Sequence, residues 1–358
     1  MAKYENKDGV GIIPEGTTII KGECYECAFD NYESMTSVII PESVTEIGRD
    51  AFNGCINLKS VVIPNSVTKI DFCAFMDCKS LINIVIPDSV EIIQSGAFDR
   101  CKNLTSLFIP NSVKDLDGAF RKCMGLTNIV VAEGNPVYDS RDNCNAIIKT
   151  KTNELILGGS SSFIPDSVTS IVDSAFCDCA DLTDIVIPDS VTEIGNYAFG
   201  NCVGLTNIVI PDSVASVGSG IFNGCRELTN ITVSTGNKTF DSRNNCNAII
   251  ESETNTLIQG CANTVIPDSV TKIGAFAFEF CVGLSSIIIP NSVTEIGWYA
   301  FKDSGLTSIS IPKSVTEIDS ECFDCCSSLK TIYVPTGRAD YYKKCLPEKW
   351  HSFIVEQP

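Results

Sequence analysis

Apolar and polar positions along this chain follow a pattern that recurs every 23 residues. Pro41, Pro64 and Pro87 are spaced 23 apart, and each proline ends a short stretch of the form Leu-x-x-Ile-x-Ile or a close variant. Eleven units marked by such a proline run from Pro14 to Pro312. Because so short a unit cannot bury its apolar positions alone, the pattern predicts that successive units stack into a solenoid.

Each unit is expected to contain one short strand followed by turns. In the unit that contains Pro211, the side chains of Leu205, Ile208 and Ile210 would face inward from the strand. Proline would end this strand because it has no N–H to donate to a neighbour. The Asp-Ser pair that follows predicts a turn, and the next Val-x-x-Ile-Gly stretch is expected to return to the core. Ala-Phe-x-x-Cys would then fill the far side of the unit.

The repeated residues resemble those of a known family. The string Ile187-Pro-Asp-Ser-Val-Thr-Glu-Ile-Gly-Asn-Tyr-Ala-Phe-Gly-Asn-Cys202 resembles the BspA-type (treponemal-type) leucine-rich repeat, and the likeness covers about residues 13–335. The resemblance implies an α/β repeat fold: a right-handed leucine-rich-repeat solenoid of 23-residue units, made mostly of short parallel strands and loops. It also implies display on the cell surface of a host-associated microbe, a role in cell adhesion, and no catalytic residues.

Two units are longer than the others. The spacing to the next proline of the pattern rises to 55 residues after Pro110 and to 56 after Pro211. The extra segments, residues 131–163 and 233–265, have equal length and share the motifs Asp-Ser-Arg and Asn-Cys-Asn-Ala-Ile-Ile. In each segment a polar turn separates two apolar stretches, which predicts a hairpin of two strands. We infer that a block of about 102 residues was duplicated.

Both ends of the chain lose the pattern, as expected for segments that cover the core of a solenoid. We expect one domain, in which residues 1–39 form an N-terminal cap with a degenerate first repeat. Residues 40–335 would form the solenoid, and residues 336–358 a C-terminal cap. In that cap, residues 338–345 are expected to form a short helix and Trp350 to cover the last turn.

Composition and charge exclude several classes of partner. The chain of 358 residues has 44 acidic and 26 basic residues, a net charge of −18, which disfavours nucleic acid and anionic membranes. No apolar stretch approaches the length of a membrane span, and the first residues lack the apolar core of a signal peptide. We therefore expect no nucleic-acid partner, no membrane span and no cofactor, and we expect a monomer.

Cysteine is unusually abundant, with 19 residues. Nine cysteines stand three residues after the phenylalanine of their unit: Cys55, Cys78, Cys101, Cys123, Cys179, Cys202, Cys225, Cys281 and Cys326. A column at one phase of the repeat predicts a ladder of buried, unreactive thiols. Disulfides between neighbouring turns are the alternative. They fit the spacing of stacked strands, but parallel side-chain directions give poor disulfide geometry.

Two C-x-x-C pairs raise the alternative of a metal or redox site. The first motif consists of Cys24 and Cys27, and the second of Cys322 and Cys325. Two such pairs can hold zinc when they meet in space, but these pairs lie near opposite ends of the solenoid sequence. Cys27 and Cys322 also stand near the core alanine position of their units. We therefore expect them to pack in the core, and we expect no metal site.

Two further groups of residues are candidates for chemistry. His351, the only histidine, stands near Cys345, so a thiol hydrolase in the C-terminal cap is a remote alternative. Residues 139–143 and 241–245 offer oxygen atoms to a calcium ion, but each segment contains an arginine among the would-be ligands. We expect these segments to form turns and find no catalytic motif elsewhere.

The strand surface that faces away from the core is the candidate binding site. The fifth position of Leu-x-x-Ile-x-Ile points outward, and it is apolar in nine of eleven units. These residues, here called the apolar strip, are Ile39, Val62, Val85, Phe108, Val130, Val186, Val209, Ile288 and Tyr333. Small polar residues at the third position would border the strip. Such a strip is typical of an interaction site, although exposed strands favour β-branched residues in any case. Phe108 and Tyr333 are the expected anchors.

The sequence thus predicts a non-enzymatic solenoid that binds a protein or matrix macromolecule on its sheet face. By resemblance, such a protein would be an adhesin at the cell surface or secreted. The alternative is an intracellular protein-interaction scaffold with the same binding mechanism, because a ladder of reduced thiols suits a reducing compartment equally well.

Overall fold

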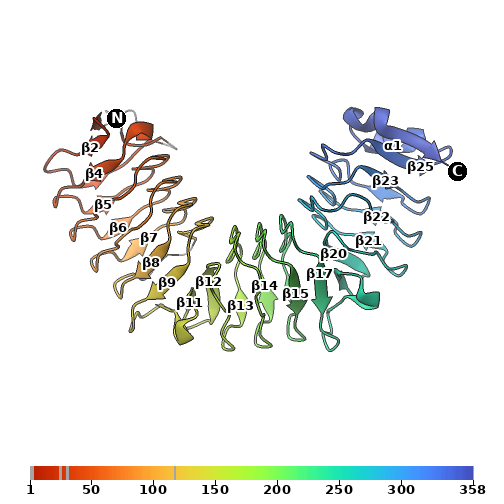
Figure 1. Ribbon diagram of the computed structural model, residues 1–358, viewed down its shortest axis with the longest axis horizontal. Helices are drawn as coiled ribbons and strands as arrows, with labels where there is room; N and C mark the ends of the chain where they lie inside the picture. Colours follow the sequence, from red (N-terminus) through yellow and green to blue (C-terminus); the bar gives the residue numbers. More distant parts are fainter. Residues whose placement is uncertain (1–3, 24–25, 30–31, 117, 358) are drawn as a thin grey trace. The chain divides into compact units, whose positions relative to one another are not determined.

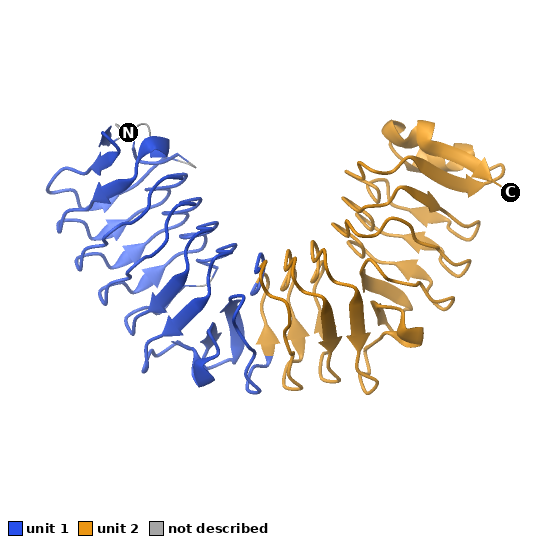
Figure 2. Cartoon of the chain, viewed as in Figure 1, with its two compact units in different colours: residues 1–169, 175–179 blue, residues 170–174, 180–358 orange. Residues whose placement is uncertain are grey.

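The chain folds as a β-solenoid with about 23 residues to a turn (Figure 1), which confirms the predicted solenoid. The computed structural model describes residues 4–23, 26–29, 32–116 and 118–357. Two compact units divide the chain (Figure 2): residues 1–169 with 175–179, and residues 170–174 with 180–358. The limits of the solenoid and of its caps stay predictions from the sequence.

Most turns contribute their Leu-x-x-Ile-x-Ile stretch to a first set of strands, which pair in four short sheets and are together called the first sheet here. Its strands in the first unit are β1 (Glu5–Lys7), β2 (Val10–Ile12), β4 (Ser37–Ile39), β8 (Ser106–Ile109) and β9 (Asn128–Val131). Its strands in the second unit are β15 (Asn207–Ile210), β17 (Asn230–Val233), β23 (Ser308–Ser310), β25 (Thr331–Pro335) and β26 (Ile354–Gln357). Apart from the antiparallel pair β1–β2, neighbours pair in parallel. Ile208 and Ile210 are buried and Val209 is exposed, which confirms the predicted phase.

A second set of strands follows the proline turn, and the sequence pattern did not predict it. These strands belong to three sheets, two of which also contain the hairpin strands, and are together called the second sheet here. Its strands in the first unit are β3 (Ile19–Ile20), β5 (Glu46–Ile47), β6 (Lys69–Ile70) and β7 (Ile92–Ile93). Its strands in the second unit are β13 (Ser170–Ile171), β14 (Glu193–Ile194), β16 (Ser216–Val217), β21 (Lys272–Ile273), β22 (Glu295–Ile296) and β24 (Glu317–Ile318). Each strand turns one residue outward and one inward. A parallel ladder forms here because the inward isoleucine recurs at the same height in successive turns, while the outward residue varies, as Glu46 beside Lys69 shows.

Columns of identical side chains fill the core. The rings of Phe52, Phe75, Phe98 and Phe120 stack with centroids 4.9, 5.1 and 4.9 Å apart. These distances match the spacing of stacked strands, so each ring packs on its counterpart one turn away. The main chain follows the same register, since the N–H of Phe75 donates to the carbonyl oxygen of Ala97 at 2.7 Å. The stacking of the rings and the hydrogen bonds of the main chain therefore repeat from turn to turn in the same register.

The two long units contain the predicted hairpins. The first consists of β10 (Tyr138–Asp139), the 3-10 turn η2 (Arg141–Asn143), β11 (Ala146–Lys149) and β12 (Glu154–Gly158). The second consists of β18 (Phe240–Asp241), η3 (Arg243–Asn245), β19 (Ala248–Glu251) and β20 (Thr256–Gly260). Both hairpins pair antiparallel. Glycine ends β12 and β20 because a Cβ there would overlap the ring of Phe176 or Phe278.

Side chains of the long unit also accept hydrogen bonds from N–H groups at the edge of the preceding strand. Ser140 accepts a hydrogen bond from the N–H of Val131 at 3.0 Å, and the side chain of Asn145 accepts from the N–H of Ile129. In the second long unit Ser242 accepts from the N–H of Val233 at 2.9 Å. These contacts replace the strand that a regular turn would have supplied, so the first sheet ends at β9 and β17 without unpaired donors at these positions.

The C-terminal end is closed by α1 (Ala339–Cys345), the 3-10 turn η4 (Glu348–Phe353) and β26. The predicted helix over 338–345 is confirmed and begins one residue later. Trp350 is buried and lies edge-on to Phe323, with centroids 6.5 Å apart, so it covers the last ring of the phenylalanine column as predicted. No helix in the described part of the chain is long and apolar enough to cross a membrane.

Candidate binding surface

In the first unit the apolar strip forms a row of exposed side chains on the first sheet. Ile39 and Val62 are 72% and 79% exposed, and Phe108 is 52% exposed. Val62 lies beside Val85 through a parallel bridge, and Phe108 beside Val130 in the β8–β9 register. The side chains of the predicted residues in this unit are therefore exposed to solvent, while the opposite face of the same strands packs against the core.

In the second unit the apolar strip is less continuous. Val186, Val209 and Ile288 are exposed, Ile288 at 86%. Tyr333 is only half-exposed, because it lies in register between Ser310 on β23 and Val355 on β26. The first unit thus presents its predicted anchor, Phe108, more fully than the second presents Tyr333.

Four further apolar residues occupy the same phase and were missed by the sequence analysis. Phe163 and Val265 are exposed, and each stands two residues before the proline that ends its long unit. Ile12 lies beside Ile39, and Val355 beside Tyr333. The Ile-Pro pairs after Phe163 and Val265 carry the signal, but Phe163 and Val265 themselves fall at the ends of the extra segments of the long units.

Polar residues border the apolar strip without adding much charge. The amide oxygen of Asn83 accepts a hydrogen bond from the hydroxyl of Ser106 at 3.3 Å on the neighbouring turn. Threonines one position earlier bond the main chain of the previous turn, as Thr127 does to Thr105 at 3.3 Å. These polar side chains are engaged by their neighbours, so the apolar side chains are the groups left for a partner.

The cysteine column lies in the core, as predicted. Seven of its nine members are buried, and Cys225 and Cys281 are partly buried. The thiol of Cys78 donates to the carbonyl oxygen of Phe52 at 3.2 Å, and that of Cys326 to Phe301 at 2.9 Å. Burial raises the pKa of the Cys179 thiol to about 12. The raised pKa keeps the Cys179 thiol protonated at neutral pH, and the hydrogen bonds of Cys78 and Cys326 link each of these cysteines to the preceding turn.

The C-x-x-C cysteines that the structure describes differ in their surroundings. Cys24 lies outside the described residues, while Cys27 is buried and its Sγ lies 3.3 Å from that of Cys55. Cys322 is buried and Cys325 is exposed, so these two thiols point to different environments. Within the described residues, no group of three or more His, Cys, Asp and Glu side chains is arranged to hold a metal ion.

The remaining chemical candidates have structural roles. Nε2 of His351 lies 3.0 Å from the carbonyl oxygen of Leu346, so the histidine takes part in the hydrogen bonding of the cap. Asp139, a would-be calcium ligand, is held by Arg141 through contacts of 2.7 and 2.6 Å. The same arginine reaches Asn153 at 2.7 Å. These segments form turns, as the sequence predicts.

Comparison with known proteins gives two kinds of match. The BspA type leucine-rich repeat region matches in six copies, over residues 22–144, 159–259 and 249–349. A leucine-rich repeat protein from Eubacterium ventriosum is similar in structure, with a TM-score of 0.60 and 25% sequence identity over 86% of each chain. No curated protein matches the chain.

Two other solved structures align over longer stretches with lower TM-scores. A leucine-rich repeat protein from Bacteroides ovatus is 22% identical, with a TM-score of 0.45 over 98% of this chain and 94% of that one. A leucine rich cell surface protein from Faecalibacterium prausnitzii is 26% identical, with a TM-score of 0.46 over 95% and 83%.

The repeat match and the fold agree. The six matched copies span most of the chain and coincide with turns whose leucine, isoleucine, phenylalanine and cysteine columns face the core. Leucine-rich repeat proteins of this kind are typically non-enzymatic binding scaffolds. The chain belongs to the BspA type leucine-rich repeat family.

Proposed function

We propose that this protein is a non-enzymatic scaffold that binds a protein or matrix macromolecule along the apolar strip. The observation that carries the proposal is the regular row of exposed apolar side chains on the first sheet of each unit. Contiguous exposed apolar surface is uncommon on soluble proteins unless a partner covers it. In the first unit the row continues over successive turns, so it offers contacts to a partner that extends along the sheet.

The side chains of the apolar strip lose little conformational freedom on binding. Valine and isoleucine have few side-chain rotamers, and here they project from hydrogen-bonded strands, so little conformational entropy is lost when a partner covers them. Each such side chain contributes about 1.5–3 kcal/mol when it is fully removed from water. Phe108 is the largest exposed side chain at the centre of the row in the first unit and is the expected anchor.

Two substitutions test the proposal: Val85→Asp in the first unit and Val209→Asp in the second. Both side chains are exposed, so we expect the variants to fold, and to lose binding because a charge would have to be desolvated at the interface. The measurement is surface plasmon resonance against immobilised fibronectin, fibrinogen and collagen. Glu193→Gln, on the second sheet, is the control and should bind as the wild type.

The outcome of this experiment separates two parts of the proposal. If neither strip variant changes the affinity for a matrix protein that binds the wild type, the strip is not the binding surface. If none of the three matrix proteins binds the wild type, the matrix ligand is wrong and the scaffold role must be tested with other proteins.

We further propose that the protein is displayed at the cell surface or secreted, as an adhesin. The resemblance to BspA-type proteins supports this location. Protease treatment of intact source cells tests it, since a surface protein should be cleaved before lysis. Protection until lysis would favour the alternative, an intracellular interaction scaffold.

A further inference from the structure

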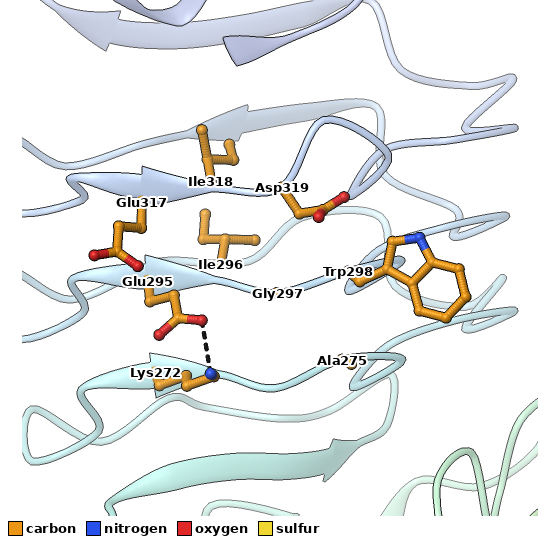
Figure 3. Close-up of a pocket in the computed structure, with 9 residues that line it drawn as sticks. All are labelled: Lys272, Ala275, Glu295, Ile296, Gly297, Trp298, Glu317, Ile318 and Asp319. Atoms are coloured by element: carbon orange, nitrogen blue, oxygen red, sulfur yellow. Dashed lines mark ion pairs between the residues drawn. The ribbon is translucent and has the colours of Figure 1, made fainter.

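The second unit has another surface, whose chemistry differs from that of the apolar strip. A hollow of about 410 Å³ opens on the second sheet over strands β21, β22 and β24. The carboxylates of Glu295 and Glu317 form one side and the indole of Trp298 forms the other, with Gly297 between them (Figure 3). Asp319 adds a third carboxylate beside Gly297 (Figure 3).

The hollow has an excess of negative charge. Lys272 pairs with Glu295 at 2.6 Å, but no ion pair engages Glu317 or Asp319 among the residues that the structure describes. Glu295 and Glu317 are direct neighbours in the β22–β24 register. Like charges opposite one another on adjacent strands repel, and a cation bound between them would relieve this repulsion.

The indole of Trp298 is held rigidly at the edge of the hollow. It stacks on Tyr299 with centroids 4.2 Å apart and meets the ring of Phe276 edge-on at 4.9 Å. Its Nε1–H donates to Glu321 at 2.7 Å. Trp298 nevertheless remains 43% exposed. A fixed indole beside carboxylates attracts cations through its ring face as well as through charge.

The residues at the equivalent positions of the neighbouring turns leave this indole partly exposed. Ala275 and Ser320 occupy the equivalent positions of the turns before and after Trp298, and neither is large enough to cover the ring. If Trp298 served only the packing of its turn, larger neighbours would be expected to enclose it. An aromatic side chain placed between two small ones is available to a ligand.

We propose that this hollow binds an arginine or lysine side chain from an extended basic segment of a partner protein. The cationic group would lie against the indole of Trp298 and pair with Glu317 and Asp319. A sugar could also stack on the indole, but it would leave the carboxylates of Glu317 and Asp319 without a counter-charge, so the charge favours a cation. This site lies on a different sheet from the apolar strip and does not depend on it.

A fluorescent peptide tests the proposal. The probe is a short peptide of alternating arginine and serine that carries an uncharged fluorophore, and its anisotropy is followed as the full-length protein is added at low ionic strength. We expect Trp298→Ala to weaken binding about tenfold. Glu317→Gln should weaken it several-fold and reduce its dependence on salt. Glu193→Gln is the matched control, because Glu193 is the exposed residue at the equivalent position of β14.

Three results would overturn the proposal. The first is equal binding of a peptide in which glutamine replaces every arginine. The second is unchanged affinity in both Trp298→Ala and Glu317→Gln. The third is a combination of two results: the arginine peptide does not bind, and a neutral oligosaccharide, maltohexaose, binds in a way that Trp298→Ala abolishes. If Trp298→Ala lowers the unfolding temperature, the comparison of Glu317→Gln with Glu193→Gln decides, since both residues are exposed and their substitutions should not affect folding.

Discussion

The cysteine column fills the space between turns with a side chain that is small, apolar and still able to donate one weak hydrogen bond. In the Cys78 and Cys326 contacts, the acceptor is the carbonyl oxygen of a phenylalanine of the preceding turn. Ser304 takes the place of cysteine in one turn, is buried, and lies 3.6 Å from the sulfur of Cys326. This position of the repeat therefore favours a small side chain that can donate a hydrogen bond. A thiol donates that bond with a lower cost of desolvation than a hydroxyl.

Thiol labelling of the native protein tests this role. Of the cysteines that the structure describes, Cys325 alone is exposed, so iodoacetamide should modify it first. Cys78 and Cys101 should remain unlabelled until the protein is denatured, because burial excludes the reagent and raises the pKa of both thiols. Mass spectrometry of the labelled peptides is the measurement. Fast native labelling of Cys78 or Cys101 would contradict the buried ladder.

Residue positions were the most predictable part of this protein. The inward phase of Leu205 and the outward phase of Val209 follow from alternation along a strand, and repetition over many units averages out local exceptions. Phe163 and Val265 were missed because the long units lack the full Leu-x-x-Ile-x-Ile stretch before their prolines, so only the Ile-Pro pair marks the phase. The hollow at Trp298 could not be predicted, because it depends on which side chains of three successive turns lie next to each other.

At the scale of elements, the second sheet and the long units show two limits of the repeat pattern. Strands of two residues, such as β5 and β22, are too short for an alternation to be seen in the sequence. In the long units, the Asp-Ser-Arg motif has a role that neither charge nor spacing alone reveals. Arg243 holds Asp241 through its Nε at 2.7 Å and also reaches Asn255 at 2.8 Å, which fixes the turn to the hairpin.

The substitution Asp241→Asn tests this contact. Partial burial alone would raise the pKa of Asp241, but hydrogen bonds from Arg243 and Ser252 outweigh it, so the pKa is lowered. The ionised carboxylate therefore stabilises the fold above its unfolded pKa, and this stability is lost as the pH falls through the folded pKa. We expect Asp241→Asn to reduce the free energy of unfolding at pH 7 by about 1–3 kcal/mol.

Urea unfolding at neutral and acidic pH is the measurement for this variant. The difference from the wild type should shrink as the pH falls below about 4, the ordinary pKa of aspartate. Asp268→Asn is the control, since Asp268 is exposed, and it should have little effect at either pH. A difference for Asp241→Asn that stayed constant with pH would mean that the charge of Asp241 does not contribute to stability.

On the scale of the whole chain, stability comes from contacts between adjacent turns within each compact unit. The phenylalanine column illustrates this, since each ring contacts the ring of the turn before and the turn after. In such an array the energy is close to a sum over turns and their interfaces, so damage to one turn affects its immediate neighbours first.

Phe199→Ala in the second unit tests this view. Phe199 is fully buried and stacks on Phe222 with centroids 5.8 Å apart, so truncation should leave a cavity and cost about 3–5 kcal/mol. Both tryptophans lie in this unit, so their fluorescence in urea reports its unfolding. Val186→Ala, at an exposed position, should cost less than about 0.5 kcal/mol. An unchanged midpoint for Phe199→Ala would contradict the assigned core.

The constant spacing of partners has a consequence for how such a protein changes over generations. Ile47 lies beside Ile70, and Ile70 beside Ile93, each 23 residues further along the chain. If one whole turn were lost or copied, the residues on either side would meet a neighbour of the same kind as before, in the same register. The length of the apolar strip can therefore grow or shrink one turn at a time over generations, while the outward residues of each turn vary independently.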